Sequence, residues 1–323
     1  MDQLLSLLQA ALVFGTVILF GSIGEILTEK SGNLNLGVPG IMSLGGIAGL
    51  AGSFMYETGN PSPEPLVGLL IALVCSIVAS TLAGLIYSFL TISLRANQNV
   101  TGLTLTIFGA GVANFFGGAM NAMAGGVGQI SVAATSGAFR ATLPFLSGIG
   151  VFSALGFMVY LAIILAFITA WFLNKTRKGL NLRAVGENPG TADAAGISVT
   201  KYKYLSTCVG AAITGLGGLY YVMDYIKGTW ANDGGIEKLG WLAVALVIFA
   251  RWKPRHAIWG SYLFGILFWL FFYIPGLTRS SQEIFKMLPY LVTIIVLIFV
   301  SIRRRRENQP PGSLGLPYFR EDR

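Results

Sequence analysis

Residues 174–203 read NKTRKGLNLRAVGENPGTADAAGISVTKYK, and long apolar runs lie on both sides of this polar stretch. A compact helix signal sits inside it. Asn188 is a good N-cap, Pro189 suits the first helical position, and Gly196 can end the helix in a left-handed conformation. The stretch therefore predicts a short helix of one or two turns in a basic loop. Such a helix is either a docking surface for another protein or an ordinary solvated turn.

The composition of the whole chain indicates a polytopic membrane protein. Of its 323 residues, 54% are hydrophobic and 11% are charged, and the mean hydropathy is +0.69. The N-terminal apolar run lacks the basic start and the cleavage site of a signal peptide, so we interpret it as a first span. We expect an all-α fold of about 8–10 transmembrane helices, since several runs approach the roughly 20 residues that cross a bilayer.

The order of spans and charges predicts the orientation. When spans alternate and the C-terminus is placed inside, 17 of the 22 Lys and Arg residues fall in cytoplasmic loops and 5 fall outside. Basic residues collect on the cytoplasmic side. We therefore expect the N-terminus outside, a transmembrane domain over 1–302 with loop 174–203 in the cytoplasm, and a basic cytoplasmic tail over 303–323. The candidate spans are 4–24, 36–56, 66–90, 100–120, 152–173, 204–223, 239–250, 257–275 and 285–302.

Two stretches do not fit continuous spans. SGNLNLGVPG (31–40) places Asn, Gly and Pro where the second span should begin, so we expect it to be extended or broken. LGWLAVALVIFA (239–250) is too short to cross alone, and the polar IKGTWANDGGIEK (226–238) before it would then dip into the protein. Irregular backbone at membrane depth is tolerated only against protein or water. The two segments thus indicate half helices along a polar pathway, or else frayed helix ends.

Small residues recur at the spacing that lets helices approach closely. Gly45, Gly49 and Ser53 form one such stripe, and Ala211 with Gly215 repeats the pattern. In lipid, stripes of this kind indicate tight helix packing, with packing between subunits as one form of it. They carry no chemistry of their own.

The residues of this sequence do not indicate catalysis. The single histidine, His256, lies in the basic loop RWKPRH, and no Gly-Lys dipeptide is present, so the chain lacks a Walker A loop. Cys75 and Cys208 fall in apolar runs and behave as small hydrophobic residues. The acidic residues fall near predicted span ends or in loops, whereas ion-coupled carriers use ionisable groups deep in the membrane. These features predict a channel, or a transporter that a partner powers.

Four stretches together resemble one family. GSIGEILTEKSGNLNLGVPGIMSLGG (21–46) looks like the start of the permeases of bacterial ATP-binding cassette (ABC) importers in the branched-chain amino acid, simple sugar and nucleoside group. Within that group, the amino-acid sequence of this stretch is most similar to the nucleoside permeases that work with BMP-type lipoproteins. RANQNVTGLTL (95–105), LRAVGENPGTADAAGIS (182–198) and LGWLAVALVIFARWKPRHAIWGSYLFG (239–265) agree with this resemblance in the family's order. Pro39 is a departure, since most nucleoside-type members would carry an acidic residue there.

The resemblance implies a multi-pass subunit of the bacterial cell membrane that is not itself an enzyme. Separate cytoplasmic ATPase subunits would bind ATP and Mg, so this chain would hold no cofactor or metal of its own. An extracytoplasmic lipoprotein would deliver the substrate, and a second permease chain, identical or different, would complete the pathway. The expected contacts are thus these proteins, membrane lipids and a nucleoside-like molecule, and not nucleic acid.

The resemblance also implies a role for the short helix, which would sit in a groove on the ATPase. We name residues 187–196 the coupling segment: Glu187, Asn188, Pro189, Gly190, Thr191, Ala192, Asp193, Ala194, Ala195 and Gly196. A nucleoside is flat, polar and uncharged, so its path requires aromatic faces and amide groups rather than fixed charge. The broken segments and the fourth span offer these candidate path residues: Asn33, Asn35, Asn114, Asn121, Trp230 and Asn232.

Two alternatives remain at this point. Within the same family, the substrate could be a simple sugar or another small polar solute. From another class, a secondary transporter or passive channel with inverted repeats explains the broken segments equally well. It explains less well why ionisable groups are missing from the middle of the spans and why a helix signal lies in loop 174–203.

Overall fold

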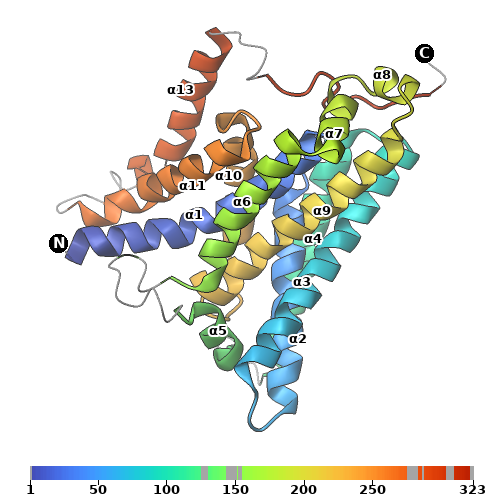
Figure 1. Ribbon diagram of the computed structural model, residues 1–323. Helices are drawn as coiled ribbons and strands as arrows, with labels where there is room; N and C mark the ends of the chain where they lie inside the picture. Colours follow the sequence, from blue (N-terminus) through green and yellow to red (C-terminus); the bar gives the residue numbers. More distant parts are fainter. Residues whose placement is uncertain are drawn as a thin grey trace.

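The computed structural model describes residues 2–124, 130–142, 151, 155–274, 283–285, 287–302 and 309–320. In these residues the secondary structure is helical, apart from one isolated bridge between Thr142 and Gly156. The helices of Figure 1 are α1 Asp2–Glu29, α2 Val38–Gly59, α3 Pro65–Ser88 with η1 Phe89–Ser93, α4 Gln98–Met123, α5 Ala133–Arg140, α6 Phe157–Lys175, α7 Arg177–Glu187, α8 Pro189–Ala194, α9 Val199–Tyr220 with η4 Tyr221–Tyr225, α10 Gly235–Phe249, α11 Pro254–Trp269 with η5 Leu270–Tyr273, and α13 Leu288–Ile302.

Each of the predicted spans coincides with a helix. Seven helical stretches within the described residues are long and apolar enough to cross a membrane. Helices α10 and α13 have 15 residues each, which gives a length of about 22 Å, against about 30 Å for the bilayer core. The all-α polytopic fold is confirmed, with the run 239–250 as a short helix. Parts of the spans predicted at 152–173, 257–275 and 285–302 lie outside the described residues.

Helices α1, α2 and α9 form the centre of the bundle. Helix α1 packs against α9, α11, α10 and α6, and its side chains Phe20, Ile23 and Ile26 are fully buried. The most apolar stretch of α9 is 78% buried, whereas that of α3 is only 28% buried. The outer helices, α3 and α4 among them, therefore present their apolar side chains as a surface for lipid or another subunit.

The small-residue stripes pack within the chain. A Cβ atom built on Gly45 would lie 2.6 Å from Gly215, and one on Gly218 would lie 1.8 Å from the carbonyl oxygen of Met42. Such distances are too short for any side chain. Helices α2 and α9 thus meet backbone against backbone, and the stripe at Gly45 serves the fold of one chain.

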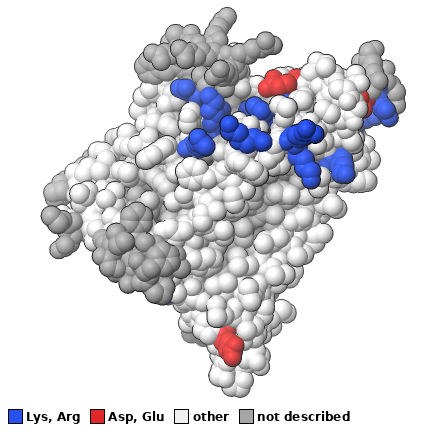
Figure 2. All heavy atoms as spheres, in the orientation of Figure 1, with Lys and Arg blue, Asp and Glu red and all other residues white. Residues whose placement is uncertain are grey.

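Basic side chains gather at one end of the molecule, where α7 and α8 lie (Figure 2). The loop after α1, the loop before α4 and the C-terminal segment meet there: Gly315 N–H donates to Gly32 O, and the Arg95 guanidinium lies 4.5 Å from the centre of the Phe319 ring. By the distribution of basic residues, this end faces the cytoplasm. The run Arg303–Arg306, which contributed to the predicted orientation, lies outside the described residues.

Candidate functional site

The coupling segment forms the predicted short helix. The Asn188 side chain accepts a hydrogen bond from Thr191 N over 3.0 Å, and Pro189 occupies the first turn of α8. At the other end Gly196 has φ +81°, Gly196 N–H donates to Asp193 O, and Ile197 N–H donates to Ala192 O. This pair of bonds is a Schellman motif. Both ends of α8 are therefore fixed by the local sequence.

One face of α8 is anchored and the other is open. Ala192 is buried and packs with Val185 of α7 and Val199 of α9. Thr191, Ala194 and Ala195 are exposed, and in Figure 1 α8 lies at the edge of the molecule beside α7 and the first turns of α9. The open face carries short side chains, so a flat partner surface can approach the backbone closely.

The basic flank of the coupling segment is itself a helix, which the sequence did not reveal. Helix α7 begins at Arg177, with the Thr176 hydroxyl accepting from Gly179 N, and ends where Asn188 N–H donates to Ala184 O. A Cβ atom on Gly186 would lie 2.3 Å from Lys30 O. Burial lowers the pKa of the Lys30 ammonium, and the nearby carboxylate of Glu187 opposes that shift. The loop after α1 therefore lies directly against the coupling segment.

The C-terminal segment also packs on the coupling segment. Ser313 donates to Gly186 O from its backbone N–H (2.9 Å) and from its hydroxyl (2.6 Å). Farther along, the Tyr318 hydroxyl donates to Asp193 Oδ2 over 2.9 Å, and Arg320 Nε lies 3.3 Å from the same oxygen. The described residues 309–320 of the tail are thus seated along α7 and α8.

The first broken segment, residues 30–37, is held by buried hydrogen bonds. Asn33 Nδ2 donates to the Thr207 hydroxyl over 3.0 Å, Asn35 N–H donates to Glu25 Oε1 over 3.0 Å, and Asn35 Oδ1 accepts from Gly37 N over 2.9 Å. The break that was predicted over 31–40 is confirmed as far as Gly37, whereas residues 38–40 form the first turn of α2. Both asparagines are buried at the cytoplasmic end, where they fix the loop to α1 and α9.

Two carboxylates that support this loop were missed in the sequence. Glu25 and Glu29 are 1% and 3% exposed on the last turns of α1. Glu29 accepts a hydrogen bond from the Trp252 indole N–H. The first span was predicted to end at residue 24, but α1 continues to Glu29. The i, i+4 spacing of the two glutamates could have indicated that the helix continues past residue 24, because it places both side chains on one face of a helix.

The second broken segment brings three of the candidate path residues near one another. After η4 the chain turns through 226–234, and Trp230 is 4% exposed. Trp230 Nε1 donates to Asn232 Oδ1 over 2.7 Å, and the indole covers Gly117 of α4. Trp230 and Asn114 line one small cavity of about 10 Å³ together with Ser43, which is room for about one water molecule.

The six candidate path residues therefore form two groups. Asn114, Trp230 and Asn232 lie near the outer half of α4, with Asn121 close by on the same helix, where its Oδ1 accepts from Ile130 N over 2.9 Å. Asn33 and Asn35 lie at the cytoplasmic end. Over the part of the chain that the structure describes, no group of three or more His, Cys, Asp or Glu residues could hold a metal ion.

A helical bundle with broken spans and a capped helix at its basic end is typical of a membrane transport protein, and comparison with known proteins gives the family. Residues 7–297 match the family described as branched-chain amino acid transport system / permease component. The chain belongs to this family. It is the membrane permease subunit of an ABC importer, a multi-pass protein of the cell membrane, and not an enzyme. The alternative of a secondary transporter or channel is thereby excluded.

The chain is similar along nearly all its length to individual members. It is 32% identical to a provisionally named glucose ABC transporter permease protein, TsgC13, of Haloferax volcanii, over 98% of both chains. It is 31% identical to the nucleoside ABC transporter permease protein NupC of Lactococcus lactis, over 88% of this chain and 89% of that one. It is 29% identical to the guanosine ABC transporter permease protein NupQ of Bacillus subtilis, over 99% of both. Permeases of this family work with ATPase subunits and a substrate-binding protein.

Proposed function

We propose that this chain forms the translocation pathway for nucleosides in an ABC importer. The observation that carries the substrate class is similarity to two nucleoside permeases: NupC and NupQ match at 31% and 29% identity. Both matches span most of the chain, 88% of it for NupC and 99% for NupQ. The substrate-binding partner would be an extracytoplasmic lipoprotein, and the second permease chain would be identical to this one or a different member of the family.

The coupling segment would be the contact with the ATPase. Helix α8 is anchored through Ala192 and presents Thr191, Ala194 and Ala195 outward. A pushed helix transmits force only if it is fixed to the membrane domain, and α8 is fixed through α7, α9 and the tail. Closure of the ATPase subunits would then shift the equilibrium between two states of the pathway, because the two states differ in their contacts with the partner.

The candidate path residues fit a nucleoside by their chemistry. Trp230 offers an indole face for a base, and Asn114 offers an amide for a base edge or a sugar hydroxyl. They line a common cavity that holds about one water molecule. A nucleoside therefore requires this region to open, as alternation between two states provides. Asn33 and Asn35 would belong to the cytoplasmic exit, where their present hydrogen bonds hold the loop.

A second candidate substrate is a simple sugar, because the chain is 32% identical to the glucose-named permease TsgC13. A transport measurement distinguishes the nucleoside from the sugar as the substrate. The complex of this chain with its permease, ATPase and lipoprotein partners is reconstituted in liposomes, and ATP-dependent uptake of labelled guanosine, adenosine and glucose is measured. We expect saturable uptake of the nucleosides and none of glucose. Uptake of glucose without nucleosides would reject the nucleoside assignment and leave the permease function intact.

A further inference from the structure

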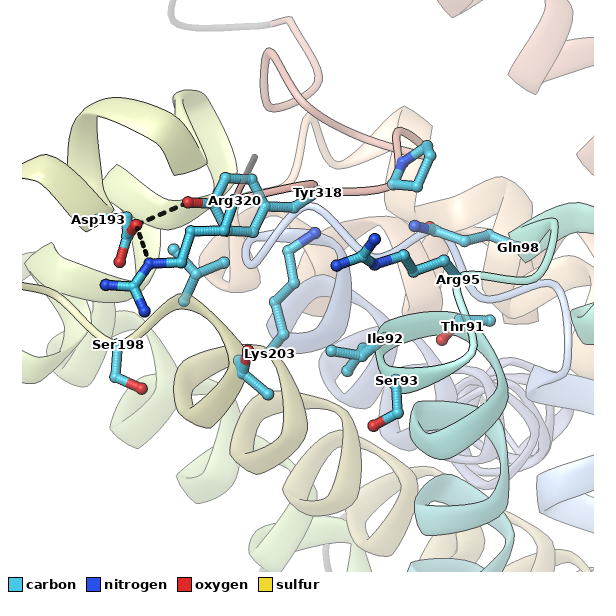
Figure 3. A pocket seen from close by; sticks show the side chains of 13 residues that line it. Thr91, Ile92, Ser93, Arg95, Gln98, Asp193, Ser198, Lys203, Tyr318 and Arg320 are labelled. Atoms are coloured by element: carbon cyan, nitrogen blue, oxygen red, sulfur yellow. Dashed lines mark hydrogen bonds and ion pairs between the residues drawn. The ribbon is translucent and has the colours of Figure 1, made fainter. Parts of the chain in front are cut away.

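A cavity of about 510 Å³ lies on the cytoplasmic side, between η1, the start of α9 and the C-terminal segment. Neither the coupling role nor the substrate path uses it. Its volume falls within the range of small-ligand pockets, about 300–1,000 Å³. Figure 3 shows its lining, in which Arg95, Lys203 and Arg320 supply positive charge.

The observation that calls for a ligand is Lys203. This residue is 2% exposed, and its side chain extends from α9 into the cavity (Figure 3). Among the described residues its ammonium group has no hydrogen-bond or ion-pair partner. A buried charge is costly unless it is paired, so this ammonium group requires an anion.

The nearby acidic group does not meet that requirement. Within the described part of the lining the one carboxylate is that of Asp193, and its Oδ2 already accepts from Tyr318 and pairs with Arg320 at 3.3 Å. The described lining also carries the cations of Arg95, Lys203 and Arg320, of which Arg320 pairs with Asp193. Lys203 is the cation that Asp193 leaves without a partner among the described residues.

The remaining lining favours a phosphate group. Ser198, Val199 and Thr200 form the first turn of α9, and Ser198 makes no side-chain hydrogen bond that caps this helix. Free N–H groups at a helix N-terminus bind phosphate oxygens. The hydroxyls of Ser198 and Thr200 and the guanidinium groups add further donors, and the planar fork of arginine matches a phosphate oxygen pair.

We propose that this cavity binds a phosphate group, contacted by Lys203, Arg95, Arg320 and the first turn of α9. The phosphate belongs either to the head group of an anionic lipid or to a soluble phosphate compound. In both cases the anion bridges η1, α9 and the C-terminal segment, next to the coupling segment. This inference does not depend on which substrate the permease carries.

The test uses the full chain in an uncharged detergent. Thermal unfolding is followed with increasing inorganic phosphate, with chloride added to keep the ionic strength constant. A ligand of the folded state raises the melting temperature. We expect phosphate to do so in the parent protein. In Lys203→Met, phosphate should be at least about ten-fold less effective, although this variant should be more stable than the parent without phosphate, since it removes an unpaired buried charge.

Two further variants separate the site from general effects. Lys201→Met removes an exposed lysine two residues away that does not line the cavity, so it should keep the parental response. Arg320→Gln changes a side chain that is 75% exposed and does not threaten folding, and it should weaken the response as Lys203→Met does.

A lipid arm identifies the source of the phosphate. The same proteins are purified from vesicles of phosphatidylcholine with phosphatidylglycerol, and the retained lipids are counted by native mass spectrometry. A phosphate response without selective lipid retention assigns a soluble compound; retention of phosphatidylglycerol that Lys203→Met abolishes assigns a lipid. If neither appears, or if Lys201→Met and Lys203→Met behave alike, the proposal is wrong. It is equally wrong if Lys203→Met affects only assembly with the ATPase, because the anion would then be a protein carboxylate.

Discussion

The Tyr318 hydroxyl donates a hydrogen bond of 2.9 Å to Asp193 Oδ2, which ties the C-terminal segment to the helix of the coupling segment. These residues are 125 positions apart in the chain. Movement of α8 must therefore carry the tail with it or break this bond. Since Ser313 is bonded to Gly186 as well, the tail is attached at two points, one directly before the coupling segment and one within it.

Tyr318→Phe tests this attachment. The variant removes one hydrogen bond and keeps the ring, so we expect the free energy of unfolding to fall by about 1 kcal/mol or less. Amide hydrogen exchange in 312–320 should become faster than in the parent, and exchange within α1 and α9 should not change. Asp193→Asn should act in the same direction, because it also loses the ion pair with Arg320. Unchanged exchange in both variants would show that the tail is held by other contacts.

The orientation is tested by cysteine labelling. Thr191 and Glu64 are both exposed, the first on α8 and the second in the loop between α2 and α3. In a background without Cys75 and Cys208, Thr191→Cys should react with an impermeant maleimide only from the cytoplasmic side, and Glu64→Cys only from outside. The reverse pattern would overturn both the orientation and the coupling role.

Glu25 is predicted to stabilise the loop after α1. Its Oε1 accepts from Asn35 N in a buried setting. Glu25→Leu leaves that N–H without a partner, which costs about 1–3 kcal/mol. Glu25→Gln keeps an acceptor oxygen and should cost less. The melting temperature of the purified chain measures both. Equal stability of Glu25→Leu and the parent would mean that the carboxylate does not support the loop.

Local patterns in the sequence were sufficient to predict the helices and α8. The apolar runs mark each span, and the Asn188-Pro189 pair with Gly196 forms the caps that α8 uses. The end of α1 was predicted five residues too early, at 24 instead of Glu29. A glutamate in a span is disfavoured unless it finds a partner, and the partners of Glu25 and Glu29 are a backbone amide of the next loop and Trp252, far along the chain.

Features that depend on distant contacts were missed for the same reason. Helix α7 is rich in Lys and Arg and has no continuous apolar stripe, so its helicity follows from packing on α6, α8 and α9. The tail has no pattern that predicts its position along the coupling segment. Asn33 and Asn35 were chosen for their amide chemistry, and the structure places both in buried hydrogen bonds of the loop.

Asn114 is the cleaner test of the proposed path, because no hydrogen bond of the loop depends on it. Asn114→Leu should lower nucleoside uptake by the reconstituted complex several-fold, while assembly and basal ATP hydrolysis persist. Gly118→Ala is the control variant. Gly118 lies one turn away on α4, and a Cβ atom there would have no neighbour within 4 Å, so this variant should transport at the parental rate. Parental uptake by Asn114→Leu would place the path elsewhere.

Helix α8 would transmit to the pathway the conformational change that ATP hydrolysis drives in the partner. The most direct measurement of this coupling is substrate-stimulated ATP hydrolysis together with uptake in the reconstituted complex. In Ala194→Arg and Ala195→Arg a long charged side chain replaces a short exposed one and holds the partner away. We expect the equilibrium constant for docking to fall by about ten-fold or more, which corresponds to a loss of about 1.4 kcal/mol or more, and uptake to fall with it. Stimulation by substrate should disappear, and the thermal stability of the membrane chain should remain parental. Ala195→Ser, which keeps a short side chain, should behave as the parent does. Full substrate-stimulated hydrolysis and uptake in both arginine variants would contradict the coupling role of α8.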